Sequence, residues 1–184
     1  MNIPTTSTPT TLTTNNQQPQ QPTTMQITVT IDIHELVYDI QNKTYLTGRS
    51  RGDGKNYRQV ALMQVNNDDE NYNQIMRSIG NALAKVKAEL SEVLSDNASE
   101  GNNTLDVDTA TVSLPLQMPG NFNNAATDSI VAAIHQFIVA FVTSEWFMIT
   151  NKADTADYAQ LAETSLEMLR ESLCKRKKPS RSKG

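Results

Sequence analysis

The chain has little of the chemistry on which most enzymes depend. It contains 184 residues, among them one cysteine and two histidines. Cys174 has no second cysteine with which to form an intrachain disulfide, and this fits a protein made in a reducing compartment. His34 and His135 lie far apart and have no cysteine or carboxylate at a metal-ligand spacing. Serines and threonines are abundant, but none stands in a nucleophile-elbow sequence. The sequence therefore predicts a protein that is not an enzyme and needs no metal or cofactor.

Charge is absent from the start of the chain. Residues 1–24 hold nine threonines, four glutamines and four prolines, without one charged side chain. No charged segment followed by an apolar one opens the chain, so we expect no secretion signal. A segment with so few apolar side chains cannot offset the entropy that it loses on ordering. We expect this Thr/Gln/Pro arm to be disordered in isolation, with an extended arm that lies along a partner as the alternative.

Basic residues are concentrated at the other end. The chain carries 16 basic and 20 acidic residues, and its last ten positions hold six of the former and none of the latter. An acidic body with a basic tail predicts that the tail meets an anionic partner: nucleic acid, a membrane surface or the acidic face of a neighbouring copy. No aromatic residues are interleaved with these cations, which favours contact with phosphates over stacking on bases. The candidate contact residues are Lys175, Arg176, Lys177, Lys178, Arg181 and Lys183.

A second basic segment runs from Gly48 to Arg58. Its three glycines predict an exposed loop. The spacing from Gly48 to Gly54, and the Asn56 that follows Lys55, do not match a phosphate-binding loop. We expect either a solvated loop or a basic patch that faces a partner. The candidate contact residues here are Arg49, Arg51, Lys55 and Arg58.

One segment is far more apolar than an ordinary surface helix. Residues 130–142 read Ile-Val-Ala-Ala-Ile-His-Gln-Phe-Ile-Val-Ala-Phe-Val. If residues 127–149 are helical, apolar side chains appear on nearly every face, which is typical of a helix surrounded by partners. A membrane span needs about 20 apolar residues, whereas this run is shorter and contains His135 and Gln136. We therefore predict a buried core helix with His135 as a hydrogen-bonded core residue, and no membrane.

The remaining patterns predict the elements around this helix. Apolar residues recur at helical spacing after a cap at Asp32, through residues 69–95, and after a cap at Asp154. The last of these helices has an acidic outer face with Glu163, Glu167 and Glu171. Alternation predicts strands at 26–33 and at 105–118, the second ended by Pro115 and by Pro119-Gly120, and a short strand or extended linker at 57–65.

Together these patterns predict a mainly α fold. We expect a bundle of about four helices around a buried helix, with a two-stranded β-ribbon or extended arm and flexible termini. The expected organisation is an arm at 1–24, a helical domain at 25–174 with its β-arm at about 104–118, and a basic tail at 175–184.

The order of these elements from Met25 to Lys178 resembles that of the small head–tail connector, or adaptor, proteins of tailed bacteriophages. The likeness is greatest at Glu145-Trp146-Phe147, Asp157-Tyr158 and 166–178. The resemblance implies a virion structural protein that forms a ring of about a dozen copies at the portal vertex, with DNA passing through the centre. The implied partners are other copies of the chain, the portal protein, and tail or other neck proteins, after assembly in the cytoplasm of a bacterial host.

The residues themselves leave two other functions open. One is a DNA-associated bacterial structural protein that contacts phosphates through the basic tail at 175–184. The other is a peripheral membrane protein held by the same tail. The arm at 1–24 is longer than the connector resemblance implies, so its role is not explained by that resemblance.

Overall fold

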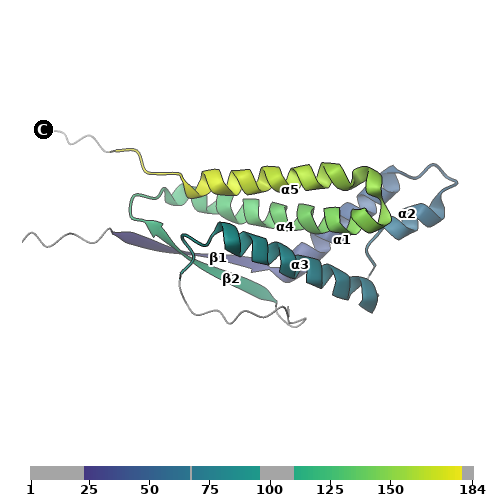
Figure 1. Ribbon diagram of the computed structural model, residues 1–184, viewed down its shortest axis with the longest axis horizontal. Coiled ribbons are helices and arrows are strands. Elements are labelled where there is room, and N and C mark those ends of the chain that lie inside the picture. The colour runs from purple at the N-terminus through teal and green to yellow at the C-terminus, as the bar shows by residue number, and fades with distance from the viewer. Residues whose placement is uncertain (1–22, 67, 96–109, 180–184) are drawn as a thin grey trace, which may run out of the picture.

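The fold is mainly helical with one small sheet, as the sequence predicts. The computed structural model describes residues 23–66, 68–95 and 110–179. Most of the predicted N-terminal arm, residues 104–109 of the predicted β-arm, and residues 180–184 lie outside these ranges. In chain order the elements are β1 (Thr24–Asp32), α1 (Ile33–Ser50), α2 (Tyr57–Met63), α3 (Asp69–Glu89), β2 (Thr111–Pro119), the 3-10 helix η1 (Asn124–Ala126), α4 (Thr127–Thr150) and α5 (Lys152–Leu173) (Figure 1).

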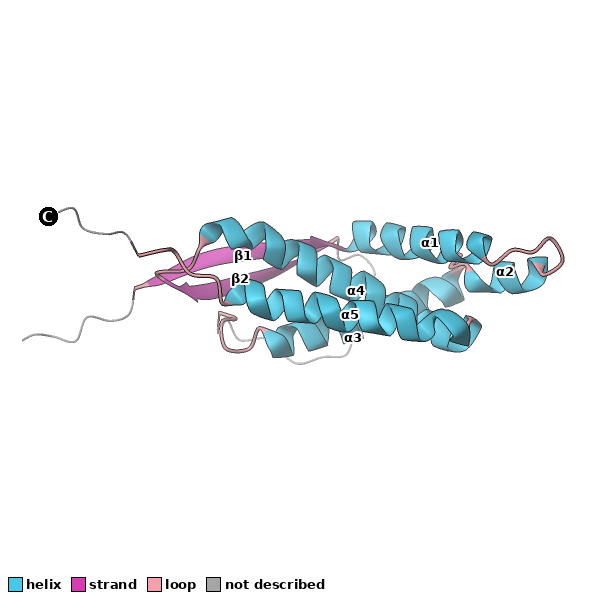
Figure 2. Cartoon of the chain, turned by 90° about the horizontal axis from the view of Figure 1, so that it is seen from above, coloured by secondary structure: helices cyan, strands magenta, loops and turns pink. Residues whose placement is uncertain are grey.

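Two strands that are far apart in the sequence form an antiparallel sheet. β1 pairs with β2 along its full length, from Thr24 opposite Pro119 to Asp32 opposite Thr111. Because side chains alternate between the faces of a strand, the odd positions of β1 and the even positions of β2 share one face. That face is apolar and contacts α4, whereas the other face is polar and exposed (Figure 2). The buried residues of the apolar face are Val29, Ile31, Leu114, Leu116 and Met118. The predicted two-stranded ribbon is confirmed.

β2 continues through Pro115 instead of ending there. The amide of Ser95 donates to the carbonyl of Pro115 (2.8 Å), and that of Gln117 donates to the carbonyl of Val93 (2.6 Å). The backbone groups of residues 115 and 117 therefore point away from β1, and the missing N–H of proline removes no bond to β1. The prediction that Pro115 ends the strand was wrong for this reason.

The strand ends where Pro119 and Gly120 were expected to end it. The amide of Gly120 donates to the carbonyl of Thr23 at 2.6 Å. A Cβ atom at Gly120 would lie 2.5 Å from that carbonyl oxygen, so only glycine allows so close an approach.

Asp32 joins the sheet to the first helix. Its Oδ1 atom accepts hydrogen bonds from the amides of His34 (2.8 Å) and Glu35 (3.4 Å). These amides have no partner within the helix. The carboxylates of Asp32 and Glu35 also lie near the positive end of the helix dipole. The predicted cap is confirmed, and α1 ends at Ser50.

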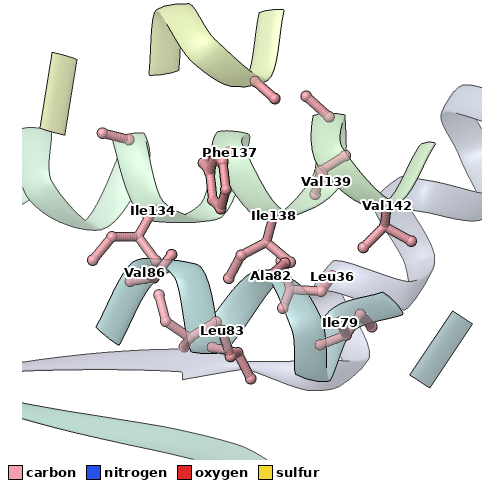
Figure 3. Close-up of a cluster of buried hydrophobic side chains, with 14 of the residues drawn as sticks. Leu36, Ile79, Ala82, Leu83, Val86, Ile134, Phe137, Ile138, Val139 and Val142 are labelled. Atoms are coloured by element: carbon pink, nitrogen blue, oxygen red, sulfur yellow. The ribbon is translucent and has the colours of Figure 1, made fainter. Parts of the chain in front are cut away.

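α4 is covered on nearly every side. Its only exposed residues are Asp128, Gln136, Met148 and Ile149. It packs against α5, α3, α1 and β1. Figure 3 shows the contact with α3 and α1, where the labelled buried residues are Leu36, Ile79, Ala82, Leu83, Val86, Ile134, Phe137, Ile138, Val139 and Val142.

The same helix is long and apolar enough to cross a membrane. The segment Asn124–Thr150 meets that test by length and composition, and 50% of its most apolar window is buried inside the chain. A core helix passes the same test. Since α1, α3, α5 and β1 already contact α4, the structure favours the predicted core helix.

Two predicted elements differ from the structure. Residues 57–65, expected as a strand or linker, contain α2, because Met63 and Val65 are buried and the indole N–H of Trp146 donates to the carbonyl of Met63 (2.8 Å). A segment this short has too few residues for its periodicity to distinguish helix from strand. α3 ends at Glu89 rather than near Ser95, and Leu94 instead bridges Leu116 beside the sheet.

Phe137 tests whether α4 is the core. Its side chain is 1% exposed. We predict that Phe137→Ala lowers the free energy of unfolding by about 3–5 kcal/mol, because it removes buried apolar surface and leaves a cavity. Urea denaturation followed by circular dichroism measures this change. The control is Gln136→Ala on the exposed side of the same helix, where we expect a change within about 0.5 kcal/mol. Equal losses in the two variants would contradict the assignment of α4 as the core.

Candidate functional site

The first part of the basic tail is paired with the rest of the chain. α5 ends at Leu173, and Arg176 then forms an antiparallel bridge with Phe122. The amide of Asn123 donates to the carbonyl of Lys175 (3.1 Å), and the amide of Lys177 donates to the carbonyl of Asn121 (2.8 Å). Phe122 is fully buried, so it anchors this pairing to the core. The basic tail predicted at 175–184 therefore begins with a segment of defined position.

The guanidinium of Arg176 helps to end α5. Its Nη1 atom donates to the carbonyl of Leu173 at 2.7 Å and to that of Lys175 at 3.2 Å. Carbonyls at a helix C-terminus have no partner within the helix, and a cation there also interacts favourably with the helix dipole.

We refer to Lys175, Arg176, Lys177 and Lys178 as the basic end. All four side chains are exposed. None of them forms a salt bridge with another residue that the structure describes. The basic end thus presents four consecutive cations to solvent from a fixed backbone. Arg181 and Lys183, the other two candidates of the tail, lie outside the described residues.

The second set of candidate cations does not form one loop. Arg49 lies in the last turn of α1, Arg51 caps its C-terminus, Lys55 lies in the connection, and Arg58 lies in α2. Arg49 stacks over the ring of Tyr45, 5.6 Å from its centroid. Only the connection at 51–56 retains the predicted loop, with Gly54 at a φ of 79°.

Arg51 is paired with a carboxylate of the same chain. Its Nε atom donates to Oδ2 of Asp154 (3.1 Å), and its Nη2 atom contacts Oδ1 of the same carboxylate. The side chain of Asp154 is 4% exposed and that of Arg51 is 56% exposed. The guanidinium of Arg51 lowers the pKa of Asp154, and a hydrogen bond from Asn151 also lowers it. The prediction that Asp154 caps α5 was wrong, because the helix begins at Lys152 after Asn151; Asp154 is instead a buried ion-pair partner that joins α1 to the start of α5.

An open hollow of about 360 Å³ lies around this ion pair. Its lining mixes both charges with a hydrogen-bonded pair, since the hydroxyls of Thr47 and Tyr158 lie 2.8 Å apart. Among the described residues, no group of three or more histidines, cysteines or carboxylates is placed to hold a metal ion. The remaining lining residues are Lys43, Arg51, Asp154, Asp157 and Leu161.

The two sets of cations lie at opposite ends of the molecule. Asp154, which binds Arg51, lies in the first turn of α5, and the basic end follows the last turn of the same helix. α5 has 22 residues. At about 1.5 Å per residue, its length separates the two sets by about 30 Å. The structure therefore does not unite the predicted cations into one surface (Figure 1).

The sequence did not reveal the partners in the polar contacts between helices. His135 binds the carboxylate of Asp39 (2.8 Å), which confirms the predicted hydrogen bond but places it at the edge of the core. Arg170 donates to both carboxylate oxygens of Glu89 (2.8 and 2.6 Å) and lowers its pKa. The sequence shows the type of each side chain but not its partner. That partner lies 96 positions away for His135 and 81 positions away for Arg170.

Comparison with models of known protein families gave no match, and neither curated proteins nor solved structures gave one.

Arg51 provides a test of the ion pair. We predict that Arg51→Met lowers the melting temperature by about 5 °C, because the buried Asp154 carboxylate loses its cationic partner. Differential scanning calorimetry measures the change. Arg58→Met removes the same charge from an exposed position on α2 and should leave the melting temperature nearly unchanged. A similar loss in both variants would show that the pair contributes nothing specific to stability.

The lowered pKa of Asp154 predicts a dependence on acid. A carboxyl whose pKa is lower in the folded state contributes stability above its unfolded pKa and loses it as the pH falls through the folded pKa. We expect the wild type to keep this contribution at neutral pH and to lose it as the pH falls below the ordinary pKa of an aspartate side chain. Asp154→Asn should be less stable near neutral pH but should lose less on acidification. Denaturation curves across this range compare the two proteins, and parallel losses would contradict the assignment.

Proposed function

We propose that this chain is a virion structural protein, a head–tail connector that forms a ring of about a dozen copies at the neck of a tailed bacteriophage. The observation that carries the proposal is the basic end: four exposed cations on a backbone held against residues 121–123. In a ring, such an end can line the channel and contact DNA phosphates without reading sequence.

The charge of the remaining surface supports this orientation. The outer face of α5 carries Glu163, Glu167 and Glu171, all of them exposed. These carboxylates repel DNA, so contact is favoured at the basic end and disfavoured along α5. A connector that must let DNA pass needs this combination of a restricted cationic surface and an acidic body.

The opposite end offers surfaces for protein partners. Tyr57 and Leu62 of α2 are 74% and 62% exposed, and Met148 and Ile149 at the end of α4 are 58% and 72% exposed. In this proposal these exposed apolar side chains contact protein partners, which removes them from water. In this proposal α1, α3 and α5 form a bundle around α4, with flexible termini. The partners are further copies, the portal protein, and tail or other neck proteins.

A DNA-associated bacterial structural protein is the second candidate. It is favoured by the same basic end, whose cations have no carboxylate partner among the described residues. The two candidates differ in where the protein is found and in how many copies assemble.

Location in the particle tests the connector proposal. Antibody labelling of purified phage particles, viewed by electron microscopy, should place the protein at the head–tail junction. Particles made without the protein should contain heads that lack tails. A strict monomer that is absent from particles and binds duplex DNA with a steep salt dependence would overturn the connector and support the second candidate.

The basic end should govern contact with DNA. We predict that the triple variant Lys175→Gln, Lys177→Gln and Lys178→Gln binds duplex DNA more weakly. The slope of log K against log salt should fall by roughly 3, because each phosphate contact contributes about 0.9. Fluorescence anisotropy at several salt concentrations measures both quantities.

The matched control removes three cations from the opposite end. Arg49→Gln, Lys55→Gln and Arg58→Gln together change the net charge equally and should leave the slope unchanged. Equal effects of the two triple variants would show that net charge, and not the basic end, determines binding.

A further inference from the structure

β1 has an edge that no described residue covers. The amide of Ile33 donates to Ala110 (2.9 Å) and the carbonyl of Thr23 accepts from Gly120 (2.6 Å), so the odd positions of β1 face β2. In an antiparallel pair the N–H and C=O of one residue point to the same side. The backbone groups at positions 24, 26, 28 and 30, together with the amide of Asp32, therefore point away from β2. Within the described ranges, no backbone hydrogen bond reaches this edge.

The edge lacks the features that usually prevent strand pairing. Natural proteins protect such edges with lysine, proline or a bulge. β1 reads Thr-Met-Gln-Ile-Thr-Val-Thr-Ile-Asp, with neither lysine nor proline, and its register with β2 is unbroken. Its one charge, Asp32, is at the last position and caps α1. The outer edge of β2, in contrast, is covered by Val93–Ser95 next to Pro115 and Gln117.

We propose that the free protein forms a two-fold dimer in which the β1 edges of two copies pair antiparallel, giving a four-stranded sheet. Pairing centred on Thr28 brings each outward-facing position opposite another: Thr28 opposite Thr28, Gln26 opposite Thr30, and Thr24 opposite Asp32. This register forms about eight backbone hydrogen bonds, because the Asp32 carbonyls already accept the first bond within α1. It sets threonine side chains across from one another, a favourable cross-strand pair. The two Asp32 side chains lie about 27 Å apart, so no like charges are opposed.

The apolar face of the sheet supports the same partner. Met25 and Ile27 are only partly buried in the single chain, unlike Val29 and Ile31. In the proposed register Met25 lies beside Ile31 of the second copy, and Ile27 lies beside Val29 of the second copy. The two apolar faces then join, and the pairing removes from water the side chains that one copy leaves half-exposed.

This dimer is distinct from the proposed neck ring. A two-fold contact joins two copies and does not by itself close a ring. The inference concerns the free protein, in which an open edge is a site of uncontrolled association, and it does not rest on the connector function.

Native mass tests the pairing. Size-exclusion chromatography with light scattering should give wild type twice the 20.4 kDa of one chain. The variant Thr28→Lys with Thr30→Lys should give the mass of one chain. The control, Thr111→Lys with Ser113→Lys, adds the same charge to the same exposed face but on β2, and should remain dimeric with an unchanged circular dichroism spectrum. A wild type of any other mass, or a Thr28→Lys/Thr30→Lys variant that stays dimeric, would overturn the proposal.

Crosslinking tests the register. In a Cys174→Ser background, Thr28→Cys should form an interchain disulfide, because hydrogen-bonded opposite residues have Cα atoms about 5.5 Å apart. Gln26→Cys alone should not, since its two copies lie about 14 Å apart. A mixture of Gln26→Cys and Thr30→Cys chains should crosslink. Crosslinking of Gln26→Cys with itself and not of Thr28→Cys would overturn this register.

A variant in the N-terminal arm distinguishes another occupant of the edge. The substitutions Thr11→Pro and Thr13→Pro remove two backbone N–H donors from the arm and leave the sequence of β1 unchanged. The dimer should persist in this full-length variant. Its loss would assign the edge to the arm and overturn pairing between the two β1 strands.

Discussion

Burial of α4 is the constraint on which the other contacts depend. α4 carries apolar side chains on nearly every face, whereas a neighbouring amphipathic helix can cover only one of these faces. Several elements must therefore share the task, and α1, α3 and α5 each contribute one apolar stripe. The sheet covers a further side with the apolar face of β1. A two-stranded ribbon is marginal alone in water, so its contact with α4 accounts for its presence in a chain that is otherwise helical.

Polar contacts between helices surround this core and decide which charges remain available to partners. The Arg51–Asp154 pair joins α1 to α5, Arg170–Glu89 joins α5 to α3, and His135–Asp39 joins α4 to α1. Arg51 is thereby committed to a structural role, although its position in a basic segment suggested a partner contact. The cations of the basic end make no such pairs among the described residues, so their charges remain available to a partner.

Features determined by nearby residues were predicted from the sequence, and features determined by distant residues were not. The core helix, the cap at Asp32 and the alternation of β1 each follow from residues within a few positions. α2 depends instead on the contact of Met63 with Trp146, and the course of the chain at Leu94 depends on Leu116. The candidate site divides in the same way: its cations were visible, but the partner of Arg51 and the pairing of residues 175–177 were not.

The connection after β2 links the open edge to the basic end. Gly120 binds Thr23 at the start of β1, while Asn121 and Asn123 bind Lys177 and Lys175. The start of β1 and the cations therefore lie at the same end of each chain. Antiparallel pairing centred on Thr28 directs those ends away from each other by more than the screening length of about 8 Å at physiological salt. A ring that lines a channel brings the same cations together, and their repulsion is offset only when DNA phosphates lie between them. The two proposed arrangements thus differ in their electrostatic requirement: the proposals together predict that the free protein favours the dimer and that DNA favours the ring.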